Sequence, residues 1–246
     1  MSLASVYSCL MLSVTDPQVP DRPDRRSVTD WTLAQTHRLI FNGDLVAGDS
    51  LNEVDLAARL NVSRSPVREA LKELEHAGMV DIDKANGRRL LRSFGIADVR
   101  ELYDIRTELE VLAARQAATA MDGRARQQLE SALDVLDGAG LDPIDVYLRK
   151  DLGFHQMIAK ATGLRRVPQM LKGVYIQHQA LLTRLDRVQS YPVSPSERKI
   201  ANLEHRQILQ ALVAGDSNEA DAAVRQHLGG RLEVVVAGLN ANGGTI

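Results

Sequence analysis

The stretch 56–74 constrains the fold of this chain more than any other part of the sequence. It reads LAARLNVSRSPVREALKEL, in which two short helical patterns are separated by Asn61 and Val62. Ser63 precedes the second pattern as a favourable N-cap residue, and Pro66 lies in its first turn, where proline is tolerated. Three basic side chains recur along the second pattern at helical spacing, namely Arg64, Arg68 and Lys72. The stretch predicts a helix-turn-helix whose second helix enters the major groove of DNA.

One further helix and a hairpin are predicted around this motif. A first helix is expected over 29–42, where apolar residues follow helical spacing until Gly43 ends the pattern. The helix-turn-helix itself is expected to comprise a helix over about 52–60 and a third helix that Ser63 caps and Gly78 ends. The first 95 residues therefore contain the helices of a compact DNA-binding domain, expected over 27–95.

The hairpin is predicted from two short alternating runs, 79–82 and 89–92. They flank an Asn-Gly pair that ends at Gly87, and this dipeptide between such runs is a strong hairpin signal. Three helices followed by a hairpin form a winged helix-turn-helix, and we call the hairpin the wing. Gly87 would let the wing backbone approach the minor groove, with Arg88 beside it.

The charge of the chain is distributed locally. Its formal net charge is −2 at pH 7, so no overall positive field draws it to DNA. Between Arg59 and Lys72, however, there are four basic residues and one acidic residue, and between Lys84 and Arg92 there are four basic residues and no acidic one. Phosphate contacts from such patches provide affinity and register on DNA.

Three residues at the start of the third helix, Ser63, Arg64 and Ser65, are predicted to point into the groove. Arg64 is the candidate for reading guanine, because its planar fork matches the O6 and N7 acceptors. Arg68, one turn later, would read a base or bind a phosphate. The alternative is a solvated basic face or a winged helix used for protein contacts. The agreement of turn, cap, wing and charge favours double-stranded DNA.

From residue 96 to about 239 the sequence shows only helical periodicity. Aromatic residues are 4% of the chain and hydrophobic residues 44%, which favours helices packed through aliphatic side chains. One apolar stripe comprises Leu102, Ile105, Leu109 and Leu112. The region 96–240 is predicted to be an all-α bundle of about six helices, so the fold class is mainly α with a small β-hairpin.

The remaining sequence features concern the compartment. Cys9 is the single cysteine, which excludes an internal disulfide and a cysteine-based metal site and fits a reducing environment. No apolar run is long enough to span a bilayer, and the apolar first residues lack a basic region before them. We expect a cytoplasmic protein with no membrane contact. Residues 1–26 are expected to form a flexible arm, because 16–26 are rich in proline and charge.

Four polar residues of the predicted bundle lie on apolar stripes. Asp151 and His155 are four residues apart and share one helix face with leucine and isoleucine. His205 and His227 lie on the apolar stripes of two later helices. A buried carboxylate and three buried imidazoles are costly unless they are paired. One divalent ion, Zn²⁺, Ni²⁺ or Mn²⁺, would satisfy all four.

The same four residues also fit simpler structural roles. A single buried histidine is usually a hydrogen-bonded core residue, and Asp151 with His155 can form a simple ion pair. Spacing alone does not show that ligands from three separate helices converge.

The N-terminal segment resembles the GntR family of bacterial transcription regulators. The matching residues are Gly43, Gly48, Leu51-Asn52-Glu53, Leu56-Ala57, Leu60, the run 62–71, Leu74, Gly78 and Gly87. The resemblance implies that the operator-contacting residues are Ser63, Arg64, Ser65, Arg68 and Gly87. The chain departs from the family at Val54, where many relatives carry arginine, and one DNA contact is thereby in question.

The region from about 96 to 239 is similar to the FCD ligand-binding domain of one GntR branch. The matching signatures are Arg106 and Glu110 in RTELE, Asp151 and His155 in DLGFH, EHRQILQAL with His205, and QHL with His227. The resemblance implies that Asp151 and the three histidines bind a metal beneath a pocket for a small carboxylate effector. The chain departs at Leu164, where the family often has asparagine after the glycine.

The pocket residues have alternative roles. Arg106 is the candidate partner of an effector carboxylate, since guanidinium binds carboxylate bidentately. Its alternative is a salt bridge with Glu110, one turn away on the same helix. His178 shares an apolar stripe and is expected in the core rather than in the pocket.

Three functions are compatible with these features. The first is a ligand-responsive transcription regulator, expected to be a repressor and a homodimer, since one short recognition helix reads too few base pairs. The second is a metalloenzyme with a DNA-binding appendage, although no general base or nucleophile is identifiable. The third is a DNA-binding regulator whose metal is structural or is itself the signal.

Overall fold

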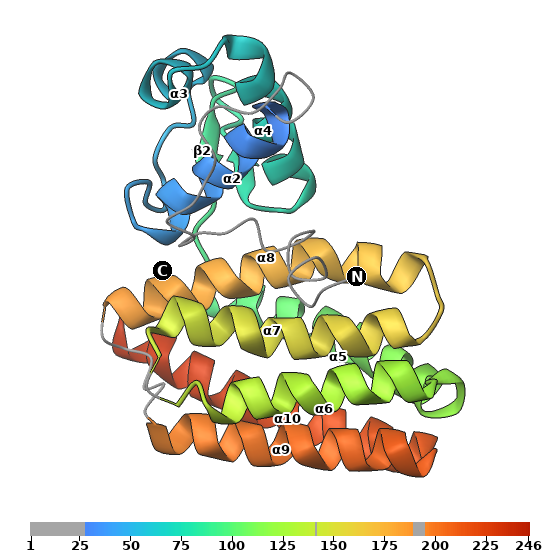
Figure 1. Cartoon of the computed structure of the whole chain (residues 1–246). Coiled ribbons are helices and arrows are strands. Elements are labelled where there is room, and N and C mark those ends of the chain that lie inside the picture. Colours follow the sequence, from blue (N-terminus) through green and yellow to red (C-terminus); the bar gives the residue numbers. More distant parts are fainter. Residues whose placement is uncertain (1–27, 141, 189–194) are drawn as a thin grey trace. The chain divides into compact units, whose positions relative to one another are not determined.

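A computed structural model describes residues 28–140, 142–188 and 195–246. The chain divides into two compact units, with the boundary between Ser93 and Phe94 (Figure 1). The predicted arm over 1–26 lies outside the described residues.

In its described residues, which begin at 28, the N-terminal unit contains three helices and a two-stranded sheet. Its elements are α2 (Val28–Phe41), α3 (Glu53–Leu60), α4 (Arg64–His76), β1 (Val80–Ile82) and β2 (Arg89–Leu91). The helices pack around fully buried side chains such as Val67, Leu71 and Leu74 of α4. This arrangement confirms the predicted winged helix-turn-helix. Helix α4 ends at His76 rather than at Gly78, and Gly78 follows with a φ of 73°, which reverses the chain.

The turn between α3 and α4 is short because Asn61 adopts the left-handed conformation, with φ 53° and ψ 46°. Asn52 caps α3, as its side-chain oxygen accepts a hydrogen bond from the Val54 amide. Ser63 occupies the N-cap position of α4, but its side chain makes no capping hydrogen bond within the described chain. The predicted N-cap position of Ser63 is therefore confirmed, but the side-chain hydrogen bond that usually accompanies it is absent among the described residues. Pro66 lies at the third helical position and has no N–H to donate to the serine oxygen.

The wing is held on both edges of its second strand. On one edge, β1 and β2 are antiparallel, with Val80 opposite Leu91. On the other edge, the Leu51 amide donates to the Arg89 carbonyl and the Leu91 amide donates to the Asp49 carbonyl, both at 2.8 Å. The segment before α3 thus adds a short third pairing that the sequence pattern does not indicate. It fixes the wing relative to the start of α3.

The C-terminal unit is a bundle of six helices in the described part of the chain, as predicted. These are α5 (Ile96–Ala120), α6 (Gly123–Asp137), α7 (Ile144–Ala161), α8 (Arg166–Arg187), α9 (Pro195–Ala214) and α10 (Ser217–Ala241). Helix α5 packs against α7, α8, α9 and α10, so it forms the centre of the bundle. Among the residues that the structure describes, no helix is both long and apolar enough to cross a membrane.

The buried face of α5 differs from the predicted apolar stripe. Ile105 and Leu112 are 46% and 48% exposed, so the expected stripe was wrong at these positions. The inward face instead carries alanines, such as Ala114, and the charged pair Arg106 and Glu110. Alanines allow neighbouring helices to approach closely, and the charged pair is tolerated inside because its members are ion-paired at 2.7 Å. The interior of the bundle is therefore partly polar.

Candidate functional site

The exposed face of α4 carries the predicted DNA-contacting residues. Ser63 and Ser65 are exposed at its N-terminus. The side chains of Arg64 and Arg68 are 61% and 50% exposed, one turn apart on the same face. Their guanidinium groups are thus available to a macromolecular ligand, as the helix-turn-helix geometry requires.

The wing carries the residues that are predicted to approach the minor groove of DNA. Gly87 has a φ of 70°, which favours glycine, and it is exposed at the hairpin turn together with Arg88. Arg89, on β2, is half-buried and ion-paired with Glu53 and Glu75. Glu53, to which the sequence pattern assigns no role on this face, lies among the arginines of α4 and the wing.

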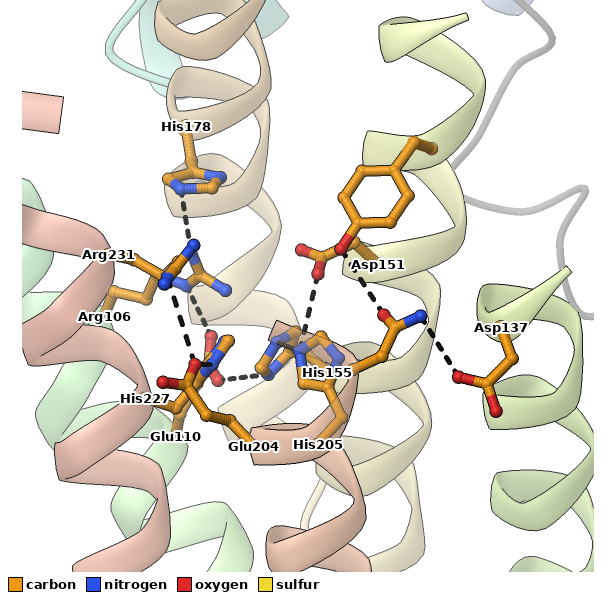
Figure 2. A network of polar contacts seen from close by, with 12 residues as sticks. Arg106, Glu110, Asp137, Asp151, His155, His178, Glu204, His205, His227 and Arg231 are labelled. Carbon is orange, nitrogen blue, oxygen red and sulfur yellow. Dashed lines mark hydrogen bonds and ion pairs between the residues drawn. The ribbon is translucent and has the colours of Figure 1, made fainter. Parts of the chain in front are cut away.

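In the C-terminal unit, three histidines from three helices meet in the interior. His155 of α7, His205 of α9 and His227 of α10 are at most 2% exposed. One ring nitrogen of each lies within 4.8 Å of the others, and we call this group the histidine cluster (Figure 2). The Nε2 atoms of His155 and His205 are 3.2 Å apart. The structure thus brings together residues that lie far apart in the sequence.

Two carboxylates hold the outer nitrogens of the cluster. Glu110 Oε2 lies 2.7 Å from His155 Nδ1, and Glu204 Oε2 lies 2.8 Å from His227 Nδ1. Burial disfavours the charged form of Glu110, but Arg106 and His155 hold the pKa of this carboxyl below its ordinary value. An ionised carboxylate at Nδ1 keeps the proton on that nitrogen and leaves the Nε2 lone pair free for another ligand.

The fourth predicted ligand, Asp151, lies beside the cluster. Its Oδ1 atom is 3.4 Å from His205 Nε2, and its side chain is buried. Burial raises the pKa of Asp151, although His155 and Arg106 oppose this shift. Asp151 therefore faces the same ring nitrogen that faces His155.

The chemistry of these residues fits a divalent metal ion. Burial and the neighbouring cationic groups lower the pKa of His205 and His227 well below the ordinary value, which favours the neutral imidazole that binds metals. Two ligands bound to one ion at about 2.0–2.1 Å lie about 3 Å apart, close to the spacing of His155 and His205. Imidazole with carboxylate suits zinc, nickel or manganese.

A small cavity lies next to the cluster. Its lining includes Asp151 and His227 together with Arg106 and His178. The salt bridge between Arg106 and Glu110, which was the alternative role predicted for Arg106, is present in the structure. Nη1 of Arg106 also lies 2.8 Å from Nε2 of His178. The Nη2 atom of Arg106 is buried and has no hydrogen-bond partner among the described residues. Arg106 is thus both ion-paired and part of the cavity lining.

His178 was expected in the core, and it is 2% exposed. It also contacts the hydroxyl of Tyr103 at 2.9 Å and lines the cavity, so it belongs to both environments. Tyr103, Arg198 and Arg231 line the cavity as well, which the sequence pattern does not predict. Their helical spacing gives no signal for it, because the cavity is formed by several helices together.

Comparison with known proteins identifies the two units. Residues 34–89 match the family described as bacterial regulatory proteins, gntR family, and residues 101–230 match the FCD domain. The transcriptional regulator YdhC of Bacillus subtilis is 30% identical over 196 residues, which cover 78% of this chain and 84% of YdhC. The chain belongs to the GntR family. Another relative, the transcriptional repressor RspR of Escherichia coli, is 28% identical over 185 residues, which cover 75% of this chain and 78% of RspR.

The fold agrees with this assignment. The solved structure of E. coli McbR/YncC has a TM-score of 0.70 at 21% identity, and the match covers 85% of this chain and 97% of that one. The GntR-family chain is accordingly a DNA-binding transcription regulator rather than an enzyme. The alternative of a metalloenzyme with a DNA-binding appendage is thereby removed.

Replacing Glu204 by glutamine is expected to weaken metal binding about 10- to 100-fold, since carboxylates that orient a ligating histidine contribute on this scale. The measurement is a competition titration against a chelating dye. Glu108→Gln is the matched control, because Glu108 is exposed on α5 and pairs with Arg225 instead of a histidine. Equal metal affinity in the two variants would argue against an orienting role of Glu204.

Proposed function

We propose that this regulator binds operator DNA as a homodimer and that a small carboxylic acid, bound over a divalent metal ion in the C-terminal unit, changes its operator affinity. The observation that carries the proposal is the histidine cluster, which lies beside a cavity that also reaches Arg106. Asp151, His155, His205 and His227 would hold the ion. Zinc, nickel and manganese all suit these ligands.

A bound metal ion is supported by the free-energy cost of burying the three histidines without one. Three buried imidazoles that face one another have too few protons and partners to satisfy each other. The carboxylates of Glu110 and Glu204 hold the Nδ1 protons of His155 and His227, which leaves the Nε2 atoms of these two rings as unprotonated lone pairs. A bound cation would accept these lone pairs and supply open coordination positions to an anionic ligand.

The effector class is supported by the polar groups of the cavity. The unpartnered Nη2 of Arg106 offers a donor to an anion, and guanidinium binds carboxylate through charge-assisted hydrogen bonds. Asp151 and His227, two of the proposed metal ligands, line the same cavity. A small acid in this cavity would therefore contact both the ion and Arg106.

The DNA-binding part of the proposal rests on α4 and the wing. Ser63, Arg64, Ser65 and Arg68 would enter the major groove, and Gly87 with Arg88 would approach the minor groove. A homodimer would place two such units on a pseudo-palindromic operator in the cytoplasm. We propose repression as the outcome, which the name of the relative RspR supports.

A substitution of Arg106 is expected to separate acid binding from metal binding. Arg106→Lys keeps the positive charge but removes the planar donor fork, so we expect acid binding to weaken about 10-fold or more while metal content stays unchanged. Calorimetric titration of the metal-loaded protein with a panel of small mono- and dicarboxylates measures the first quantity, and elemental analysis the second. Loss of metal together with acid binding would instead assign Arg106 a structural role.

In a second candidate function, the protein binds DNA through the same unit, but its metal ion is structural or is itself the signal. Chelation separates the two possibilities. If the apo protein unfolds and no acid binds the metal-loaded form, the metal is structural. If metal removal alone abolishes operator binding and no acid has an effect, the metal is itself the signal.

A further inference from the structure

One acidic side chain lies among the arginines of α4 and the wing, where the proposed function places the contacts with DNA. Glu53 is the first residue of α3, and its side chain is 17% exposed. Its two carboxylate oxygens each lie 3.3 Å from Nε of Arg68. Oε2 is also 3.6 Å from Nη2 of Arg64, and Oε1 is 3.6 Å from Nη1 of Arg89. One carboxylate thus contacts two arginines of the recognition helix and one of the wing.

We propose that Glu53 is a positioning residue that orients Arg64 and Arg68 for reading base edges. Glu53 would not contact DNA itself. It would act through the two arginines, holding their guanidinium groups in one arrangement before DNA arrives, and through Arg89 it would join this arrangement to the wing.

The atoms that Glu53 uses leave the reading edge of Arg68 free. The carboxylate is hydrogen-bonded to Nε, whereas neither Nη1 nor Nη2 of Arg68 donates a hydrogen bond to another of the described residues. The pair of terminal N–H groups is the edge that can donate to O6 and N7 of guanine. Half of the Arg68 side chain is exposed, so this edge can reach a base while Nε stays on Glu53.

The balance of charge supports the same role. Three guanidinium groups surround one carboxylate, so the face keeps a positive charge. Without the carboxylate, the three cations would repel one another and long arginine side chains would sample several rotamers. Fixing them beforehand lowers the ordering cost of binding, which favours the sequence whose acceptors match that arrangement.

A merely stabilising role predicts a different outcome from a positioning role. Ion pairs that are open to solvent contribute little to stability, and these distances of 3.3–3.6 Å are long. A carboxylate on this face also repels phosphate, so its removal alone should strengthen binding to every DNA sequence. A positioning residue behaves otherwise, because its loss weakens binding to the operator relative to other DNA.

The test compares Glu53→Gln with Glu69→Gln in the full-length protein. Glu69 is a matched control, since it lies on α4, is 51% exposed and pairs with Lys72 rather than with the reading arginines. The probes are a duplex that the wild-type protein selects from a random-sequence pool and a scrambled duplex of equal length. Affinities for both are measured by fluorescence anisotropy at one salt concentration.

Glu53→Gln is expected to reduce the ratio of selected to scrambled affinity about 10-fold, the scale of losing one oriented base contact. Glu69→Gln is expected to raise both affinities alike and leave the ratio unchanged. If Glu53→Gln also left the ratio unchanged, the proposal would be overturned, whatever happened to the absolute affinities.

A second variant controls for misfolding and for an effect of the lost charge alone. Glu53→Asp keeps the charge but shortens the side chain by one methylene, which withdraws the carboxylate from the arginines. We expect the affinity ratio to fall while the scrambled duplex binds as it does to the wild type. An unchanged ratio in Glu53→Asp would overturn the positioning role even if Glu53→Gln failed to fold.

Discussion

Arg64→Ala is expected to weaken operator binding at least about 30-fold, because each bidentate contact to guanine contributes about 1–3 kcal/mol and a dimer loses one in each half-site. Arg64 starts the recognition helix, and its side chain is 61% exposed, so the substitution leaves the core of the N-terminal unit intact. Binding to random DNA should weaken much less, since only one cation per half-site is lost. Anisotropy titrations with both duplexes measure the two effects.

Arg126→Ala is the matched control for this prediction. Arg126 is 52% exposed on α6 of the C-terminal unit and pairs with Glu130 one turn away. The substitution removes the same charge from the protein but not from the recognition helix, and salt screens the effect of net charge. Operator affinity should therefore stay within about twofold of the wild type. Equal losses in the two variants would show that Arg64 contributes only net charge.

The second large effect is expected for His205→Ala, which removes the central ligand of the proposed metal site. Even a residue that only orients a ligand contributes about 10- to 100-fold to metal affinity, so the loss of a ligand should exceed about 100-fold. A metal present at about 100 times its Kd stabilises the folded protein by about 2.7 kcal/mol, and this contribution would disappear. Elemental analysis gives the metal content, and thermal unfolding with and without added metal gives the stability.

His178→Ala distinguishes a lost ligand from a lost core residue. His178 is buried in the same unit but contacts Arg106 and Tyr103 rather than the cluster. This variant should also unfold at a lower temperature, yet keep its full metal content. A His205→Ala protein that retained the wild-type metal stoichiometry would mean that His205 is a packing residue.

Local sequence signals were sufficient for much of the fold. The turn at Asn61, the proline in the first turn of α4 and the Asn-Gly pair of the wing each have a local physical cause, and the structure shows the elements they predict. The errors arose where tertiary contacts outweigh local pattern. Ile105 and Leu112 look like core residues by spacing, but the interior of the bundle is built around the pair of Arg106 and Glu110.

The candidate site was predictable in composition but not in arrangement. Costly polar residues on apolar stripes pointed to His155, His205 and His227, because burial demands a partner for each. The partners themselves were not all visible. Glu204 lies one residue before His205 in sequence but accepts from His227, and Glu53 lies in a different helix from the two arginines that it contacts on α4. Such pairings depend on how helices pack.

The central claim is that the operator and the acid influence each other's binding through one protein. It is tested most directly by the operator affinity of the metal-loaded protein, measured with and without a saturating acid that calorimetry has shown to bind. The account predicts a change of about 5- to 150-fold, with the operator changing the affinity for the acid by the same factor. An acid that binds the metal-loaded protein and leaves operator affinity unchanged would contradict it.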